Sequence, residues 1–289
     1  MFGFYKSLFW IMDRRLRRID EPLPAFGSPL EFRDRLSGAA LQSIENAGGE
    51  KVLMSELADL ETRSLPEAAS LMTIGSRKWG GRVEVTGFEA VRQSTEKNGA
   101  IIVEPHLGVN QFISGFMMLN GLRVAGFSLV TPNRSRVYRW LQEAIVAPGI
   151  GRDAYVEIPV PSPRAMLDVL KLLRDGVPLI WNPVAFSRKT TDIHPLMIEF
   201  MGAPVGASPI IPKLLKRVKA DLYLSYCLLR DDGVDLHFEP MSLSGESEAE
   251  QVGEIYSKVE KTILGNVTQW EGWRYFTNQV LAVEQLGLP

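Results

Sequence analysis

RVEVTGFEAVRQSTEKNGAIIVEPHLGVNQFISGFMML, residues 82–119, is the part of this sequence that says most about its fold. Two short runs rich in β-branched residues, RVEVTG and AIIVEP, are each followed by a segment with apolar residues at helical spacing. Parallel strands need a long crossover between them, and that crossover is usually a helix. The alternation of strand and helix patterns therefore predicts an α/β fold with a largely parallel sheet.

The same alternation continues after residue 119. The runs RVAGFSLV, DAYVEIPV and PLIWNP are typical of strands, and the pattern SPRAMLDVLKLLRDG between the last two predicts a helix. Further on, DLYLSYCLLR and VDLHFEP flank Asp231-Asp232-Gly233 and predict a hairpin on the same sheet. We expect a mixed, largely parallel sheet flanked by helices, with a C-terminal hairpin.

The part of the chain before the sheet has helical character. Between Ser28 and Gly75, apolar residues recur at helical spacing, with Gly48-Gly49 and Pro66 as breaks. We expect these helices to pack on the sheet and to carry no chemistry.

Length and composition fit one large globular domain. The chain has 289 residues, of which 45% are hydrophobic, and this is enough to bury a substantial core. The expected order is an amphipathic membrane-interface segment over residues 1–20, a helical section over residues 21–80 and an α/β domain over residues 81–289. The last two sections are expected to form one structural unit.

Charge and cysteine content narrow the classes of function. A formal charge of −2 gives no overall case for nucleic-acid binding, because a surface that tracks phosphates shifts the balance toward basic residues. The one cysteine, Cys227, allows no disulfide framework, which fits the cytoplasm. It lies in the alternating run LYLSYCLLR, where a buried strand position is favoured over a nucleophile.

The N-terminal stretch MFGFYKSLFWIMDRRLRRID combines aromatic and basic side chains. Its apolar part is about a dozen residues long, whereas a helix that spans a bilayer needs about 20. Aromatic residues followed at once by arginines suit a helix that lies in an anionic membrane interface. The alternative is a terminal helix that packs on the domain and has solvated arginines.

The chain has three histidines, His106, His194 and His237, which are too scattered to predict a metal site. His237 alternates within a predicted strand, and His194 lies in the polar segment SRKTTDIHP. His106 follows AIIVEP, at the carboxyl end of a predicted strand, where open α/β sheets bind ligands. A neutral imidazole there can take a proton from an attacking hydroxyl or amine, and the alternative is a structural hydrogen-bonding residue.

These segments resemble the lysophospholipid acyltransferase superfamily, most closely its bacterial lipid A (lauroyl/myristoyl) branch. That family has a segment like V-E-V-x-G and then a histidine followed, after four residues, by an acid, and this chain has VEVTGFEAV and IIVEPHLGVNQF. The blocks PLMIEFMGAPVGASPIIPKLLKRVKADLYLSYCLLRDDGVDLHFEP and EIYSKVEKTILGNVTQWEGWRYF look like its F-F-G-x-P loop with helix and hairpin, and its terminal helix with a Trp- and Arg-rich tail. The resemblance spans roughly residues 80–276.

The resemblance implies acyl transfer from a thioester donor, acyl carrier protein or acyl-CoA, to a hydroxyl or amine of an amphipathic acceptor, without metal or organic cofactor. It assigns His106 as general base, and an acid would orient the imidazole. The position of that acid holds Gln111, and Asn182 stands at a second position where the family often has an acid. Glu104 is the nearest substitute, because residues two apart on a strand share a side and Pro105 favours extended geometry before it. The alternative is a strand-end carboxylate that faces water.

The remaining candidate residues would bind substrate. Ser208 is expected to cap a helix that has Pro209 at its first position, and the free N–H groups there can hold a phosphate. A basic surface that docks an acidic carrier protein or an anionic lipid is expected from Arg134, Arg136, Arg139, Lys213, Lys216 and Arg217, with solvated side chains as the alternative. The expected substrate-binding residues are Asn110, Arg134, Arg136, Asn182, Gly202, Ser208 and Arg274.

Together these features predict an acyltransferase that is peripheral to the cytoplasmic face of a bacterial inner membrane. Its acceptor would be a lipid A-like molecule, a glycolipid or a polyene or polyketide product. Two alternatives stay open. One is a non-catalytic relative that binds lipid or carrier protein, and the other is a thioester hydrolase in which water replaces the acceptor.

Deletion of residues 1–18 should move the protein from the membrane pellet to the supernatant and leave its fold intact, because these residues hold the aromatic and basic side chains. Membrane fractionation of the full chain and of the shortened chain, with circular dichroism of both, measures this. A full chain that is found in the supernatant, or a shortened chain that unfolds, would instead favour a packing helix.

Overall fold

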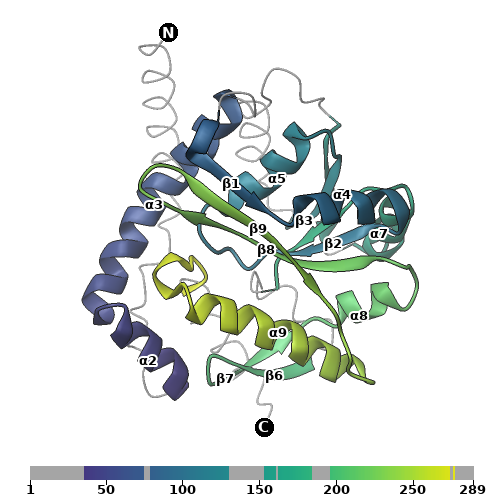
Figure 1. Ribbon diagram of the computed structural model, residues 1–289. Helices are drawn as coiled ribbons and strands as arrows, with labels where there is room; N and C mark the ends of the chain where they lie inside the picture. The colour runs from purple at the N-terminus through teal and green to yellow at the C-terminus, as the bar shows by residue number, and fades with distance from the viewer. Residues whose placement is uncertain are drawn as a thin grey trace.

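The computed structural model describes residues 36–74, 79–129, 153–160, 162–183, 196–273 and 276. Its centre is a twisted sheet with helices on both faces (Figure 1). Several sequence predictions lie outside the described residues: the segment 1–20, Arg134, Arg136, Arg139, His194 and Arg274.

The large sheet has seven strands in the order β1-β9-β8-β2-β5-β3-β4. Their bounds are β1 Val83–Thr86, β2 Ala100–Val103, β3 Val124–Leu129, β4 Tyr155–Val160, β5 Leu179–Trp181, β8 Asp221–Leu229 and β9 Val234–Met241. Neighbouring strands are parallel except β8 and β9, which form the predicted antiparallel hairpin. The prediction of a mixed, largely parallel α/β sheet is confirmed.

Helices connect the strands and cover the sheet. Their bounds are α2 Gly38–Asn46, α3 Gly49–Ile74, α4 Phe88–Lys97, α5 Asn110–Leu119, α7 Ala165–Arg174, α8 Ile210–Leu215 and α9 Glu248–Leu264, with short 3₁₀ turns η3 Gly80–Arg82 and η4 Val267–Gln269. Buried residues of α4 and α5 belong to one hydrophobic cluster, and those of α7 and α9 belong to another. The sheet therefore lies between two helical layers.

The central strand β2 is buried on both faces, which explains its uninterrupted apolar sequence AIIV. Ile101 and Val103 belong to the cluster with α7 and α9, whereas Ala100 and Ile102 belong to the cluster with α4 and α5. This alternation follows from the period of two along a strand. A parallel strand that is covered on both faces needs apolar residues at every position.

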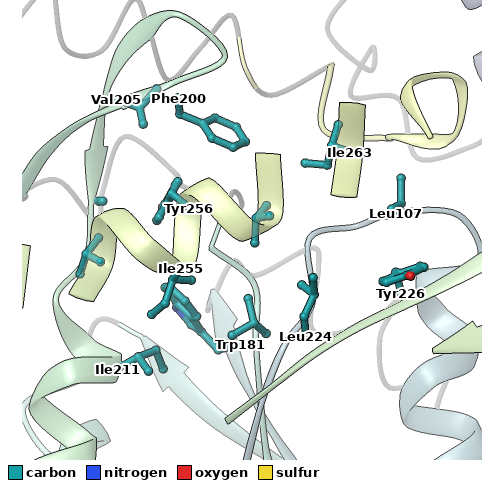
Figure 2. Close-up of a cluster of buried hydrophobic side chains, with 14 of the residues drawn as sticks. Leu107, Trp181, Phe200, Val205, Ile211, Leu224, Tyr226, Ile255, Tyr256 and Ile263 are labelled. Atoms are coloured by element: carbon teal, nitrogen blue, oxygen red, sulfur yellow. The ribbon is translucent and has the colours of Figure 1, made fainter. Parts of the chain in front are cut away.

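Helix α9 belongs to the same helical layer as α7 and packs against the sheet. Figure 2 shows Ile255 and Tyr256 of α9 above Trp181 of β5 and near Leu224 of β8. The Tyr256 hydroxyl, which is fully buried, donates a hydrogen bond to the carbonyl oxygen of Pro183 at 2.5 Å. Burial raises the pKa of Tyr256, so this phenol keeps its proton and remains a donor.

Two of the sequence predictions about local structure are wrong. Pro66 does not break the helical section, because α3 runs through it, whereas Gly48 and Gly49 do separate α2 from α3 with positive φ angles. Ser208 does not cap α8: the residue before that helix is Pro209, which makes no side-chain capping bond. Helix α8 is also only six residues long, so the expected phosphate site at its start is withdrawn.

A second sheet lies where a loop was expected. Strands β6 (Leu196–Phe200) and β7 (Ala203–Ala207) form an antiparallel hairpin, which lies beside α9 (Figure 1). Its turn contains Met201 with a φ of 55°, a conformation that turns usually assign to Asn or Gly. Ser37 donates its N–H to the Met201 carbonyl oxygen, and Met201 donates to a Glu260 carboxylate oxygen, so tertiary contacts support this turn.

The prediction for the cysteine agrees with the structure. Cys227 lies fully buried in β8, and burial raises the pKa of its thiol, so it is a strand residue of the core. Within the described parts of the chain, no helix has both the length and the apolar character needed to cross a membrane.

Two leucines on α7 provide a matched test of the core. Leu173 is 1% exposed and Leu167 is 63% exposed, although they share one helix. Leu173→Ala is expected to lower the free energy of unfolding by about 2–5 kcal/mol, because it removes buried methyl groups and leaves a cavity. Leu167→Ala, measured by the same urea titration, should change it by less than about 0.5 kcal/mol. Equal effects would contradict the packing of α7 on the sheet.

Candidate functional site

His106 lies in the site loop, residues 104–109, which joins the carboxyl end of β2 to the start of α5. Its φ angle is 56°, in the left-handed region that residues with a Cβ rarely adopt. Such a conformation costs on the order of 1–3 kcal/mol and persists only where surrounding contacts enforce it. Strained residues of this kind cluster at functional sites, so the backbone conformation of His106 favours a functional role over a purely structural one.

Glu104 lies beside His106 and is held on two sides. Its N–H donates to the Trp181 carbonyl oxygen at 2.8 Å, which extends the pairing of β2 with β5. Its Oε1 accepts the backbone N–H of His106 at 2.5 Å, and its Oε2 lies 3.5 Å from His106 Nε2. A single carboxylate therefore contacts both the backbone and the ring of the histidine.

The sequence placed these two residues together, but by a different geometry. Strand β2 ends at Val103, so Glu104 and His106 do not share the side of a regular strand. The left-handed turn at His106 brings the ring back toward the carboxylate instead. The alternative of a carboxylate in water is wrong, because Glu104 is only 6% exposed. The His106 ring is 29% exposed, which leaves it open to a reactant.

Burial sets the charge behaviour of Glu104. Loss of water around the carboxylate raises the pKa of Glu104, and the negative charge of Glu271 adds to this effect. The nearby His106 and its backbone N–H oppose the rise. Because an ionised carboxylate is costly in this place, a positive charge on the imidazole would offset that cost.

The two amides at the start of α5 have different surroundings. Asn110 is buried, and its Nδ2 donates to Glu271 Oε2 at 3.1 Å. Gln111 Oε1 is also buried, and it accepts no hydrogen bond from the residues that the structure describes. The carboxylate that approaches the His106 ring belongs to Glu104, whereas Asn110 bonds to Glu271. The carboxylate beside the His106 ring therefore comes from the site loop and not from α5.

The other predicted substrate-binding residues lie in separate places. Asn182 follows β5 directly, one residue beyond the carbonyl that bonds to Glu104. Gly202 lies in the β6–β7 turn, where a Cβ would lie 2.2 Å from the Ser37 nitrogen, so its packing explains why it is a glycine. The basic side chains at the end of α8 are partly paired, since Nζ of Lys216, the residue after this helix, is 2.9 Å from a Glu248 carboxylate oxygen.

Sequence reasoning missed the crossing segment, residues 269–271, which runs over the site loop. Leu107 and Trp270 form an isolated antiparallel bridge there, and Trp270 is almost fully buried. The sequence signal is the string QWEG after the last helix, which the sequence alone identifies only as part of a family-like tail. A tryptophan next to a glutamate favours a specific contact, but no local pattern indicates that this contact is with the loop of His106.

A metal centre has no support in the described parts of the chain, where no group of three or more His, Cys, Asp or Glu side chains could hold an ion.

Comparisons with known proteins add nothing to the assignment. No protein-family model and no curated protein matches this chain. Two weak structural matches are chains of the Euglena gracilis mitochondrial ATP synthase, each with 12% sequence identity over 90% of this chain. One, from the OSCP/F1/c-ring structure, is covered over 83% with a TM-score of 0.20, and the other, from the rotor, over 91% with a TM-score of 0.18. Such scores support no inference about fold or function.

Glu104→Gln is expected to make stability less dependent on pH. The folded protein binds the Glu104 proton more tightly than the unfolded chain does, because burial disfavours the ionised form. The stabilising contribution is fully present below the ordinary pKa of 4.5 and is lost as the pH rises through the raised folded-state pKa. Glutamine removes this loss and keeps an oxygen that can accept the His106 N–H.

Urea unfolding between about pH 4 and pH 8 measures the effect. The free energy of unfolding of Glu104→Gln, relative to the unmodified protein, should increase with pH. The control is Glu96→Gln, which changes an exposed carboxylate on α4 and should leave the pH dependence as it is. A difference between Glu104→Gln and the unmodified protein that is constant over this range would contradict the raised pKa of Glu104.

Proposed function

We propose that this protein is an acyltransferase in which His106 is the general base and Glu104 is its carboxylate partner. The observation that supports the proposal is the 3.5 Å approach of Glu104 Oε2 to His106 Nε2 at the carboxyl end of the central strand. Ligand sites of open α/β sheets lie at this edge, and the two groups are those that general-base acyl transfer needs.

In the proposed reaction the donor is a thioester of acyl carrier protein or coenzyme A. The acceptor hydroxyl or amine loses a proton to His106, and its oxygen or nitrogen attacks the thioester carbonyl carbon. A new ester or amide bond forms as the carbon–sulfur bond breaks, and the imidazolium returns the proton to the leaving thiolate. Nε2 faces Glu104, so Nδ1 is assigned to the proton transfer.

Glu104 would act through charge. The imidazolium forms next to a carboxylate that has lost most of its water, and an ion pair in such a place is stronger than in water. The energetic penalty of the buried anion is thus reduced at the step where the histidine becomes a cation. An amide at this position would fix the ring but would bring no charge, and the comparable change in a triad costs roughly 10⁴ in rate.

The acceptor and the setting remain those that the sequence resemblance implies. We propose an amphipathic acceptor of lipid A-like, glycolipid or polyketide type, and a peripheral position at the cytoplasmic face of a bacterial inner membrane. The aromatic and basic N-terminal stretch is the proposed membrane contact.

Acyl carrier protein with a radiolabelled acyl chain, mixed with lipid A precursor or glycolipid acceptors, tests the proposal. Transfer to the acceptor is the expected result. Label released as free acid at the same rate with and without acceptor would indicate a hydrolase. Label that stays on a bound carrier would indicate a non-catalytic binding protein, and either outcome overturns the proposal.

Variants of the pair then connect the activity to the site. His106→Ala should abolish transfer and leave carrier binding near its original value, because the base acts only when the proton moves. Glu104→Gln should lower kcat by roughly 10²-fold or more, and Gln111→Glu in that background should restore part of it. Unchanged transfer in His106→Ala would exclude the mechanism. Faster transfer in Gln111→Glu alone would show that Glu104 is no substitute acid.

A further inference from the structure

The crossing segment, residues 269–271, bonds to the site loop before and at His106. The indole Nε1 of Trp270 donates to the Pro105 carbonyl oxygen at 3.0 Å. The backbone N–H of Glu271 donates to the carbonyl oxygen of His106 at 3.2 Å. These bonds hold His106 in a left-handed conformation that a residue with a Cβ otherwise rarely adopts.

The crossing segment is itself fixed to the end of β8. The side-chain amide of Gln269 accepts the Leu229 N–H at 2.7 Å and donates to the Leu229 carbonyl oxygen at 3.1 Å. Its backbone carbonyl accepts the Gly108 N–H at 2.8 Å. Gly108 has no room for a side chain, because a Cβ would lie 2.0 Å from the Cys227 carbonyl oxygen. Strand β8 and the crossing segment together therefore set the position of His106.

The side chain of Glu271 is not needed for any of these backbone bonds. Its carboxylate is held separately, because Oε2 accepts a hydrogen bond from Asn110 Nδ2 at 3.1 Å. Asn110 is buried at the first position of α5, so its amide is a fixed donor. A carboxylate that is anchored in this way, and whose negative charge raises the pKa of Glu104, requires an explanation of its own.

We propose that Glu271 is a positioning residue for the His106–Glu104 pair and that Asn110 fixes its carboxylate. The inference rests on the proposed function, since it concerns the same histidine. Glu271 would hold the loop through its N–H and place a second negative charge beside the pair. The imidazolium would then form next to two carboxylates, which stabilise a cation more than one does.

The ionisable groups that face Glu104 among the described residues are His106, Glu271 and the Cys227 thiol of β8. Burial raises the pKa of Cys227 well above its ordinary value, so this thiol stays neutral at working pH. Glu271 is therefore the anion that acts on Glu104. Loss of its charge would let Glu104 ionise at a lower pH.

The first experiment compares Glu271→Ala, Glu271→Gln and Asn110→Ala in the full chain with acyl-carrier-protein donor and acceptor. Glu271→Ala should lower kcat on the order of 10–100-fold with little change in KM, because it removes both the negative charge near Glu104 and the side-chain bond to Asn110, whereas the backbone N–H to His106 remains. Asn110→Ala should lower kcat similarly. The double variant should be no worse than Glu271→Ala alone, because that change already removes the contact to Asn110.

Glu271→Gln separates charge from support. Its amide oxygen can still accept from Asn110, so the variant should fold as the unmodified protein does and retain more activity than Glu271→Ala. The acid limb of its kcat/KM profile should move to lower pH, since the negative charge that raised the pKa of Glu104 is gone. The exposed control Glu96→Gln should leave both kcat and the acid limb unchanged.

Four outcomes would contradict the proposals. Loss of transfer in His106→Ala together with full activity in Glu271→Ala would overturn this inference alone. Multiplying losses in the double variant, or an acid limb that Glu271→Gln leaves in place, would also overturn it, because a structural role does not move that limb. Full transfer in His106→Ala would instead remove the proposed function on which the inference rests.

Discussion

The hydrogen bond from the His106 N–H to Glu104 Oε1 fixes the carboxylate of the candidate site against the backbone of the histidine. The left-handed turn at His106 removes that N–H from any strand ladder, and a buried donor without a partner would be costly. The carboxylate accepts it and so gains a fixed orientation. Charged acceptors form the stronger hydrogen bonds, so this contact can balance part of the strain of the turn. The approach of Oε2 to the imidazole follows from the same orientation.

The burial of Glu104 follows in turn from the place of β2 in the sheet. Strand β2 lies between β5 and β8 and is covered by helices on both faces, so the first polar residue after it is still inside the protein. A carboxylate in such a place is tolerated only with donors or cations nearby. The backbone N–H and the ring of His106 meet that requirement. Burial raises the pKa of Glu104, and the neighbouring His106 opposes this rise through its backbone N–H and its charge.

Local patterns predicted most of the fold, and long-range contacts explain what they missed. A short run of β-branched residues gave β2, and alternating apolar residues gave the β8–β9 hairpin, because burial on one face of a sheet repeats with a period of two. The β6–β7 hairpin was missed, since Met201 occupies a turn position where Asn or Gly would have been a signal. The crossing segment was missed for another reason. Trp270 and Pro105 are 165 residues apart, and no local pattern encodes such a contact.

The amides on α5 match the carboxylates around them. Proteins that this sequence resembles place an acid on the helix after the histidine, but here that turn contains Asn110 and Gln111. Asn110 can donate to Glu271, whereas a carboxylate at that position would repel it. The negative charge of Glu271 already raises the pKa of Glu104. A third acid, placed on the first turn of α5, would make ionisation of all three carboxyl groups less favourable. Uncharged amides at the start of α5 therefore suit a loop whose carboxylates are Glu104 and Glu271.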